Sequence, residues 1–237
     1  MKIEIPPPVK PIYDRLSSRF NLEIVPLSIR GKTIKILKPS DIEALLPEEG
    51  PLKKIEDFPF WVKIWEASIV LADFIAGVKP DGRVLELGAG LGVAGLAAAA
   101  FGHEVVITDS EEDCLDFVRL SAALNDLSTV KVEKLDWREL PDLGKFEIII
   151  GAEIVFSGRY FESLFKAFRQ YLAPGGVIYL AHNKERMRTL APFLYLAEKE
   201  YEEAVSQRNL RAEDEVHEII ISRLIPKTKD WEGQSNA

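Results

Sequence analysis

The sequence contains few of the residues from which metal centres and disulfide frameworks are built. Cys114 is its one cysteine, and only three histidines occur among 237 residues. A single cysteine excludes an internal disulfide and any zinc site made of cysteines. The three histidines are scattered along the chain, so they do not have the spacing of metal ligands. We therefore expect no metal centre.

Long apolar runs and an excess of positive charge are also missing. The longest apolar run, around 92–101, is too short to span a bilayer, and the first ten residues, MKIEIPPPVK, lack the apolar core of a secretory signal. The net charge of −8 differs from that of proteins that bind nucleic acid or anionic membranes through a basic stripe. We expect a cytoplasmic protein without such partners, and we interpret Lys184, Arg186 and Arg188 as a solvated helix start. The sequence does not indicate an oligomeric state.

From residue 83 onward, short apolar runs alternate with helical patterns. Alternation of this kind predicts an α/β fold with a doubly wound, mostly parallel sheet. The last two runs are joined by a loop too short for a helical crossover, so they should lie antiparallel. The seven predicted strands lie at 83–87, 104–108, 130–134, 146–151, 177–181, 203–209 and 216–224, and the main helices between them at 92–101, 111–125, 160–172 and 184–201.

The region before this pattern predicts an extension. Four prolines among residues 1–11 favour an extended segment. Residues 22–37 read as a β-hairpin turning at Arg30–Lys32, and helices are predicted at 41–47 and 66–76. We divide the chain into an N-terminal extension with a hairpin (1–57), a main domain (58–226) and a disordered tail (227–237).

The most informative segment is RVLELGAGLGVAGL (83–96), a strand followed by a glycine-rich turn and a helix. Gly90, Gly92 and Gly95 have the spacing of a dinucleotide-binding turn, so an NAD-binding protein is a rival interpretation. Glu86 precedes this turn, which has no lysine or arginine, and a fixed carboxylate there would repel a pyrophosphate. S-adenosylmethionine instead brings an ammonium and a sulfonium, and a carboxylate suits both. The sequence favours S-adenosylmethionine as the cofactor.

Further acids follow the predicted strands. Asp109 ends the second strand, where it could accept the two ribose hydroxyls, and Asp136 follows the third with Trp137 beside it as a wall for adenine. Glu153 follows the fourth strand. Because ligands of doubly wound folds bind at the carboxyl ends of the strands, we expect these three acids and Glu86 to face one crevice.

These motifs resemble those of the seven-stranded (class I) S-adenosylmethionine-dependent methyltransferases, and within them of the family-16 protein lysine methyltransferases. The resemblance covers roughly residues 22–224 and implies a Rossmann-like methyltransferase fold and methylation of a protein lysine. PFW followed by a second Trp at 59–65 is similar to the electron-transfer-flavoprotein lysine methyltransferase branch. The segments that carry the resemblance are FPFWVKIWEASIVLADFIAG (58–77), VLELGAGLGVAGLAAAAFG (84–102), VVITD (105–109), LDW (135–137) and GAEIVF (151–156).

The resemblance also implies roles for single residues. Glu153 and Phe156 fall at the catalytic positions, where the family has an acid and usually a tyrosine, so this chain lacks that hydroxyl. Glu153 would orient the incoming amine and stabilise its methylated, cationic product. The positions that match the cofactor site of the family are Trp65, Glu86, Gly88, Gly90, Asp109, Asp136, Trp137 and Ala152.

Three other side chains have two interpretations each. Phe156 and Trp61 could form an apolar or cation–π wall around a target, or be core aromatics. His182 could accept a proton or be structural. At the level of function, a small-molecule amine or hydroxyl substrate is an alternative to a protein lysine, and an NAD-binding oxidoreductase or a non-catalytic nucleotide-binding module is a second alternative.

Overall fold

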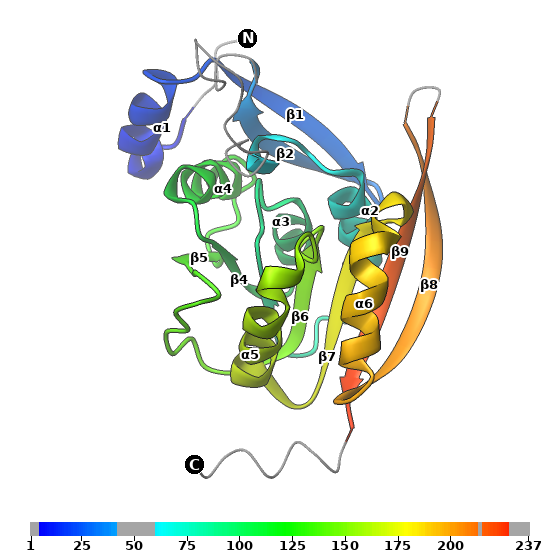
Figure 1. The fold of residues 1–237 in the computed structure, drawn as a ribbon. Coiled ribbons are helices and arrows are strands. Elements are labelled where there is room, and N and C mark those ends of the chain that lie inside the picture. The colour runs from blue at the N-terminus through cyan, green and yellow to red at the C-terminus, as the bar shows by residue number, and fades with distance from the viewer. Residues whose placement is uncertain (1–4, 42–59, 213–214, 228–237) are drawn as a thin grey trace, which may run out of the picture.

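A computed structural model describes residues 5–41, 60–212 and 215–227 and shows a seven-stranded sheet between two layers of helices (Figure 1). The strand order is β5-β4-β3-β6-β7-β9-β8. The first five strands in this order are parallel, whereas β9 is antiparallel to both β7 and β8, which confirms the predicted topology. The strands are β3 (Arg83–Glu86), β4 (Glu104–Asp109), β5 (Lys131–Lys134), β6 (Phe146–Ala152), β7 (Leu172–Asn183), β8 (Tyr201–Ala212) and β9 (Glu215–Pro226).

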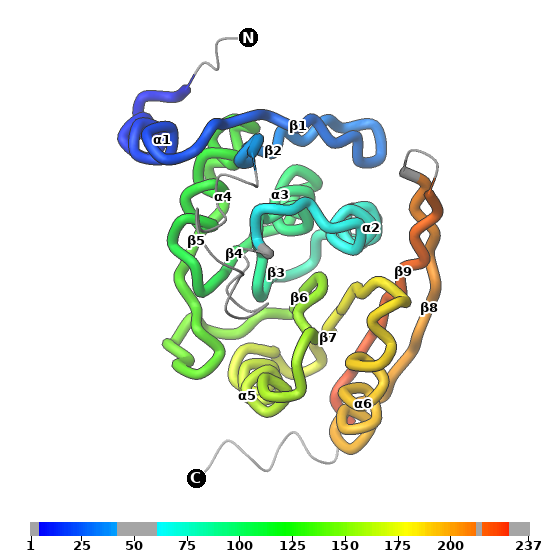
Figure 2. The backbone as a smooth tube through the Cα atoms, turned by 45° about the horizontal axis from the view of Figure 1, so that its top comes forward, coloured from blue at the N-terminus to red at the C-terminus, as the bar shows by residue number. Residues whose placement is uncertain are grey.

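Both faces of the central strands are buried, because successive side chains point to opposite helix layers. Val84 joins the core on one face and its neighbour Leu85 the core on the other. The first core is covered by α2 (Glu66–Ile75), α3 (Val93–Ala100) and α4 (Glu112–Leu124), and the second by α5 (Phe161–Tyr171) and α6 (Met187–Ala197) (Figure 2). No helix in the described parts of the chain is long and apolar enough to cross a membrane.

The N-terminal region is more helical than predicted. The expected hairpin is present as β1 (Leu22–Ile29) and β2 (Lys32–Pro39), and Arg30 and Gly31 between them have positive φ angles of 45° and 83°. The expectation of an extended segment at 1–11 is wrong for residues 7–11, since a 3-10 turn, η1 (Pro7–Val9), leads into α1 (Lys10–Ser17). Pro11 is the second residue of α1, where no N–H is needed for an intrahelical bond, so proline begins this helix instead of preventing it.

The hairpin packs on the outer side of α3 and α4 (Figure 2). The Leu37 N–H of β2 donates to Ser121 Oγ (2.9 Å). Asn125, directly after α4, accepts the Lys35 N–H through Oδ1 (2.8 Å) and donates through Nδ2 to the Lys35 carbonyl (2.7 Å). An amide side chain therefore takes the place of a further strand at the edge of β2.

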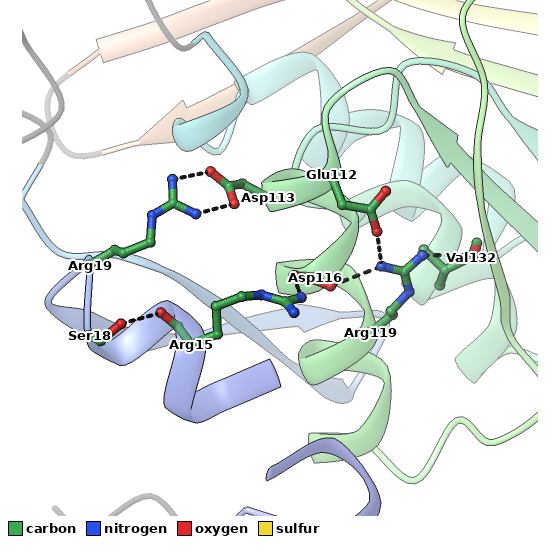
Figure 3. A network of polar contacts seen from close by, with 8 residues as sticks. All are labelled: Arg15, Ser18, Arg19, Glu112, Asp113, Asp116, Arg119 and Val132. Carbon is green, nitrogen blue, oxygen red and sulfur yellow. Dashed lines mark hydrogen bonds and ion pairs between the residues drawn. The ribbon is translucent and has the colours of Figure 1, made fainter. Parts of the chain in front are cut away.

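Ion pairs join α1 and the residues just after it to α4 (Figure 3). Arg19 binds both carboxylate oxygens of Asp113 at 2.5 and 2.6 Å, and Arg15 pairs with Asp116. Arg119 also donates to Asp116, at 2.9 Å. The Asp116 side chain is only 2% exposed, and these two arginines supply the opposite charge that its burial requires.

The structure differs from the sequence-based prediction at two further places. Pro174–Gly176, expected to separate the 160–172 helix from a strand beginning at 177, lies inside β7, which already starts at Leu172. There the register shifts, since Phe146 pairs with Leu172 but Ile148 with Val177. The predicted 184–201 helix is a 3-10 turn, η6 (Lys184–Arg186), followed by α6. The 41–47 helix and the tail, apart from their first residues, lie outside the described residues.

The Arg15–Asp116–Arg119 network predicts a measurable contribution to stability. We expect Asp116→Ala to lower the free energy of unfolding by about 1–2 kcal/mol, less than for a fully buried pair because Arg15 and Arg119 are 54% and 29% exposed. Urea denaturation measures this change. Asp14→Ala is the matched control, since it removes an i,i+4 pair with Lys10 whose side chains are both 58% exposed, and should cost no more than about 0.5 kcal/mol. Equal effects of the two substitutions would contradict this account of α1 docking.

Candidate active site

The glycine-rich turn after β3 is fixed to both neighbouring strands. The Leu87 N–H donates to the Ile150 carbonyl of β6, and the Ala89 N–H to the Thr108 carbonyl of β4, each at 3.0 Å. Gly88 has a φ of 59°, and a Cβ on it would lie 2.9 Å from Ile154 and 3.0 Å from the Trp137 ring. Glycine is therefore required at this position for both its conformation and the close approach of Trp137.

Glu86, the last residue of β3, points into the first turn of α3. Its side chain is nearly inaccessible, and Oε2 accepts the Gly95 N–H at 3.0 Å. Burial raises the pKa of Glu86 to about 8 although the Gly95 N–H favours the charged form. The carboxyl group is thus largely protonated near pH 7, and the fixed negative charge on which the sequence argument against a pyrophosphate relied is not present in this state.

Asp109, the last residue of β4, joins the glycine turn to the start of α4. Oδ2 accepts the Gly90 N–H at 2.9 Å, and Oδ1 accepts the Glu111 N–H at 3.1 Å. Burial raises the pKa of Asp109, and these two N–H groups oppose that shift. The Cys114 thiol and the Ser110 N–H also contact this carboxylate, so a ligand hydroxyl would share its acceptor positions with these groups. The ribose role assigned to Asp109 is compatible with this geometry and stays a prediction.

A partly exposed aromatic cluster lies beside the turn. The Phe156 ring centre lies 6.3 Å from that of Trp137 and 5.1 Å from that of Tyr160. Phe156 is 46% exposed, so it is not a core residue. Tyr160, predicted only as the start of a helix, ends a 3-10 turn, η5 (Gly158–Tyr160). It brings a hydroxyl into the cluster next to Phe156. Arg159 Nη2 donates to that hydroxyl at 2.8 Å.

Glu153 follows β6 in a left-handed conformation, with a φ of 57°. Its N–H donates to the Ala181 carbonyl (2.9 Å), so the backbone of Glu153 is still hydrogen-bonded to β7 although β6 has ended at Ala152. Oε1 accepts the Asn183 N–H at 2.7 Å, and Oε2 lies 3.0 Å from Arg186 Nε. The side chain is 8% exposed, and burial raises the pKa of Glu153, whereas Asn183 and Arg186 oppose that shift.

His182 is a structural residue of this segment. It is fully buried in β7, and its Nε2 accepts the Val155 N–H at 3.1 Å. Burial lowers the pKa of His182 to about 3, so the ring is neutral and the lone pair of Nε2 is already used. The proposal that it accepts a proton is wrong, and its position instead fixes the segment that carries Glu153 and Phe156.

The structure places Trp65 and Arg186 together with Glu153. All three line an open cavity of about 700 Å³ between the start of α2, the end of β7 and the start of β9. The Trp65 ring is contacted by two cations, Lys63 Nζ at 4.7 Å and the Arg186 guanidinium at 5.2 Å from its centre. Arg186 is therefore not simply part of a solvated helix start. Its position next to Glu153 depends on the end of β7, which sequence periodicity does not reveal.

The four acids at the strand ends have different partners, and the expectation that they face one crevice stays a prediction. Glu86 and Asp109 lie close enough to influence each other beneath the glycine turn. Asp136 instead binds the guanidinium of Arg138, which lowers the pKa of Asp136, and Glu153 faces the cavity with Arg186. The described residues contain no group of three potential metal ligands.

Trp61 does not form a wall with Phe156. Trp61 lies in the 3-10 turn η4 (Phe60–Val62). Its ring packs on Phe20 and Phe117, at 6.4 and 5.6 Å between centres, whereas Phe156 packs on Trp137 and Tyr160. Only its backbone approaches the turn, where its carbonyl oxygen lies 3.6 Å from the position of a Cβ on Gly90. Trp61 therefore covers the outer side of the glycine turn and α4.

Comparison with solved structures supports the fold assignment. A precorrin-6y C5,15-methyltransferase from Geobacter metallireducens superposes with a TM-score of 0.55 at 18% identity, over 68% of this chain and 88% of that one. At this identity the likeness concerns the fold alone. It agrees with the Rossmann-like methyltransferase fold that the resemblance implies.

The sequence relatives include enzymes named for lysine methylation and enzymes named for arginine methylation. Protein N-lysine methyltransferase METTL21A of Danio rerio is 35% identical over 127 residues, which are 49% of this chain and 57% of that protein. Histone-arginine methyltransferase METTL23 of Mus musculus is 34% identical over 110 residues, 43% of this chain and 44% of that protein. The chain thus matches about half the length of these curated relatives.

The family assignment rests on a longer match. Residues 60–201, which include the glycine turn, Asp109, Trp137 and Glu153, match the model of a family described as lysine methyltransferase. This match covers more than half of the 237 residues. The chain belongs to the lysine methyltransferase family.

Proposed function

We propose that this protein transfers a methyl group from S-adenosylmethionine to the side-chain nitrogen of a lysine in a protein substrate. The observation that carries the proposal is the Glu153 carboxylate, which is buried beside a cation in the cavity next to Trp65. A carboxylate in this environment suits a ligand whose reacting group is an amine and whose product is a cation. The family match and the lysine methyltransferases among the relatives support the same reaction.

The glycine turn fits the proposed cofactor. Gly88 permits the close approach of Trp137 to the turn, and Asp109 lies at the same turn with its oxygens on the Gly90 and Glu111 N–H groups. We assign the ribose hydroxyls to Asp109, the adenine to Trp137 and Asp136, and the remainder of the ligand to the turn around Gly88 and Gly90. When bound, S-adenosylmethionine supplies a methyl group on a positively charged sulfur, which makes the carbon electrophilic.

Glu153 orients the amine and does not deprotonate it. A lysine has an ordinary pKa of about 10.4, so neutralising it at pH 7 costs roughly 4.6 kcal/mol. A nearby carboxylate favours the ammonium and adds to this cost, whereas it stabilises the methylated product. Glu153 therefore holds and orients the amine, water accepts its proton, and alignment for in-line attack can contribute on the order of 7–11 kcal/mol.

The test described below distinguishes lysine from two other methyl acceptors. An arginine side chain also suits the Glu153 carboxylate, and relatives named histone-arginine methyltransferases give this candidate specific support. A small-molecule amine or hydroxyl remains a second alternative. We favour lysine because the family model that matches the chain carries that description.

The direct test is transfer of labelled methyl groups from S-adenosylmethionine into a protein lysate, followed by amino-acid analysis. We expect label in methyllysine. Glu153→Gln should lower the initial rate at least tenfold while S-adenosylhomocysteine binds with unchanged affinity. Label confined to small metabolites would contradict the protein substrate, label in methylarginine would contradict lysine, and loss of cofactor affinity in Glu153→Gln would move this residue to the cofactor site.

The assignment of Asp109 to the ribose gives a binding prediction. We expect Asp109→Ala to weaken S-adenosylhomocysteine binding by about 1–3 kcal/mol, because hydrogen bonds donated by the ligand to a charged acceptor are lost and the Gly90 N–H is released. Isothermal titration calorimetry measures the change. Asp113→Ala, which removes an acid of α4 paired with Arg19, is the control and should leave the affinity within twofold. Equal affinities of wild type and Asp109→Ala would exclude the ribose role.

The raised pKa of Glu86 predicts proton release on cofactor binding. A cationic ligand near Glu86 favours its charged form and lowers its pKa from about 8, so at pH 7 the group loses a proton when S-adenosylmethionine binds. Affinity should therefore rise with pH from about 6 to 8 and level off above that value. Calorimetry in buffers of different ionisation enthalpy should detect release of up to one proton, and Glu86→Gln should abolish it. Proton uptake, or release that persists in Glu86→Gln, would refute this coupling.

A further inference from the structure

Arg186 occupies the position from which a target cation would reach Glu153. Its Nε lies 3.0 Å from Glu153 Oε2, and its guanidinium lies 5.2 Å from the centre of the Trp65 ring. A buried carboxylate and an aromatic face are the two kinds of group with which proteins bind ammonium and guanidinium ligands. The chain therefore fills a cation-binding subsite with one of its own side chains.

The fit of Arg186 in this subsite is incomplete. Glu153 Oε1 accepts the Asn183 N–H, but within the described residues Oε2 is buried without an aligned hydrogen bond, although it forms an ion pair with Arg186. The internal cation balances the charge and leaves the hydrogen-bonding capacity of Oε2 unused. An ammonium group has three donors that rotate freely, so an incoming lysine can supply the missing bond.

The surroundings allow the Arg186 side chain to leave while the backbone stays in place. Asn183 Oδ1 accepts the Glu185 N–H at 3.0 Å and fixes η6, whereas the Arg186 side chain is 35% exposed. Five glutamates line the cavity against three lysine or arginine residues. A displaced Arg186 therefore remains among acids such as Glu185 and Glu215, and a basic target segment meets an excess of negative charge.

We propose that Arg186 is a specificity-determining gate that closes the Glu153–Trp65 subsite until a cationic side chain of a protein target displaces it. The inference rests on the proposed function, since it takes Glu153 as the group that holds the target amine. A neutral side chain cannot open the gate, because departure of Arg186 would leave the buried Glu153 carboxylate without its ion-pair partner. The gate thus selects cationic targets and keeps the subsite filled in their absence.

The test is calorimetric binding of a capped Gly-Lys-Gly peptide to the full chain saturated with S-adenosylhomocysteine at pH 8. We expect Arg186→Gln to bind this peptide at least tenfold more tightly than wild type, because the cation that pairs with Glu153 Oε2 no longer competes. Arg188→Gln is the matched control on an exposed residue at the start of α6, and should bind like wild type. The norleucine peptide, which keeps the four-carbon chain of lysine without the amine, should gain nothing from Arg186→Gln, and adding Glu153→Gln should remove the gain.

The other arms separate failure of the gate from failure of the function. A capped Gly-Arg-Gly peptide should also gain affinity in Arg186→Gln, and a gain larger than that of the lysine peptide would identify arginine as the preferred cation. Arg186→Lys keeps the positive charge without the planar stack on Trp65, and should give a gain of about threefold if Arg186→Gln does not fold. Peptide affinity that is unchanged or weaker in both Arg186 variants, with S-adenosylhomocysteine still bound, overturns the gate. A chain that does not bind S-adenosylhomocysteine overturns the proposed function instead.

Discussion

Carboxyl groups buried at the ends of parallel strands must be matched by donors from neighbouring segments, and this requirement organises the site. Asp109 takes N–H groups from the glycine turn and from the start of α4, and thereby holds β3, β4 and α4 in one arrangement. Glu86 takes the Gly95 N–H of α3. Glu153 takes the Asn183 N–H and the charge of Arg186. The same carboxyl groups that are assigned to ligands therefore also hold the secondary-structure elements in place.

The fold was predictable because each element has a local signal. Apolar runs separated by helical patterns predicted the parallel strands, and the short connection between the last two strands predicted their antiparallel pairing. The hairpin was visible from the alternation on either side of Gly31. Helix α1 was missed because a proline-rich start favours an extended chain locally, whereas its pairing with α4 depends on charges about 100 residues away.

The residue types of the site were predictable from the sequence, whereas the directions and partners of their side chains were not. Spacing placed Glu86, Asp109, Asp136 and Glu153 at strand ends, but it carries no information on where a carboxylate points or what partners it finds. Glu86 turned out to be buried against α3, which changes its protonation state. Arg186 reads in sequence as one member of a surface cluster. Its contact with Glu153 arises only when β6 and β7 are paired in register, so no local pattern could reveal it.

The buried state of His182 has a consequence for the robustness of the site. Because burial lowers the pKa of His182 to about 3, the ring stays neutral and keeps its bond to the Val155 N–H in the neutral and mildly acidic range. The loop bearing Glu153 and Phe156 is thus anchored by a contact that ordinary acidification leaves untouched. Histidine often senses acidity in proteins, but His182 holds this loop without changing its own charge in that range.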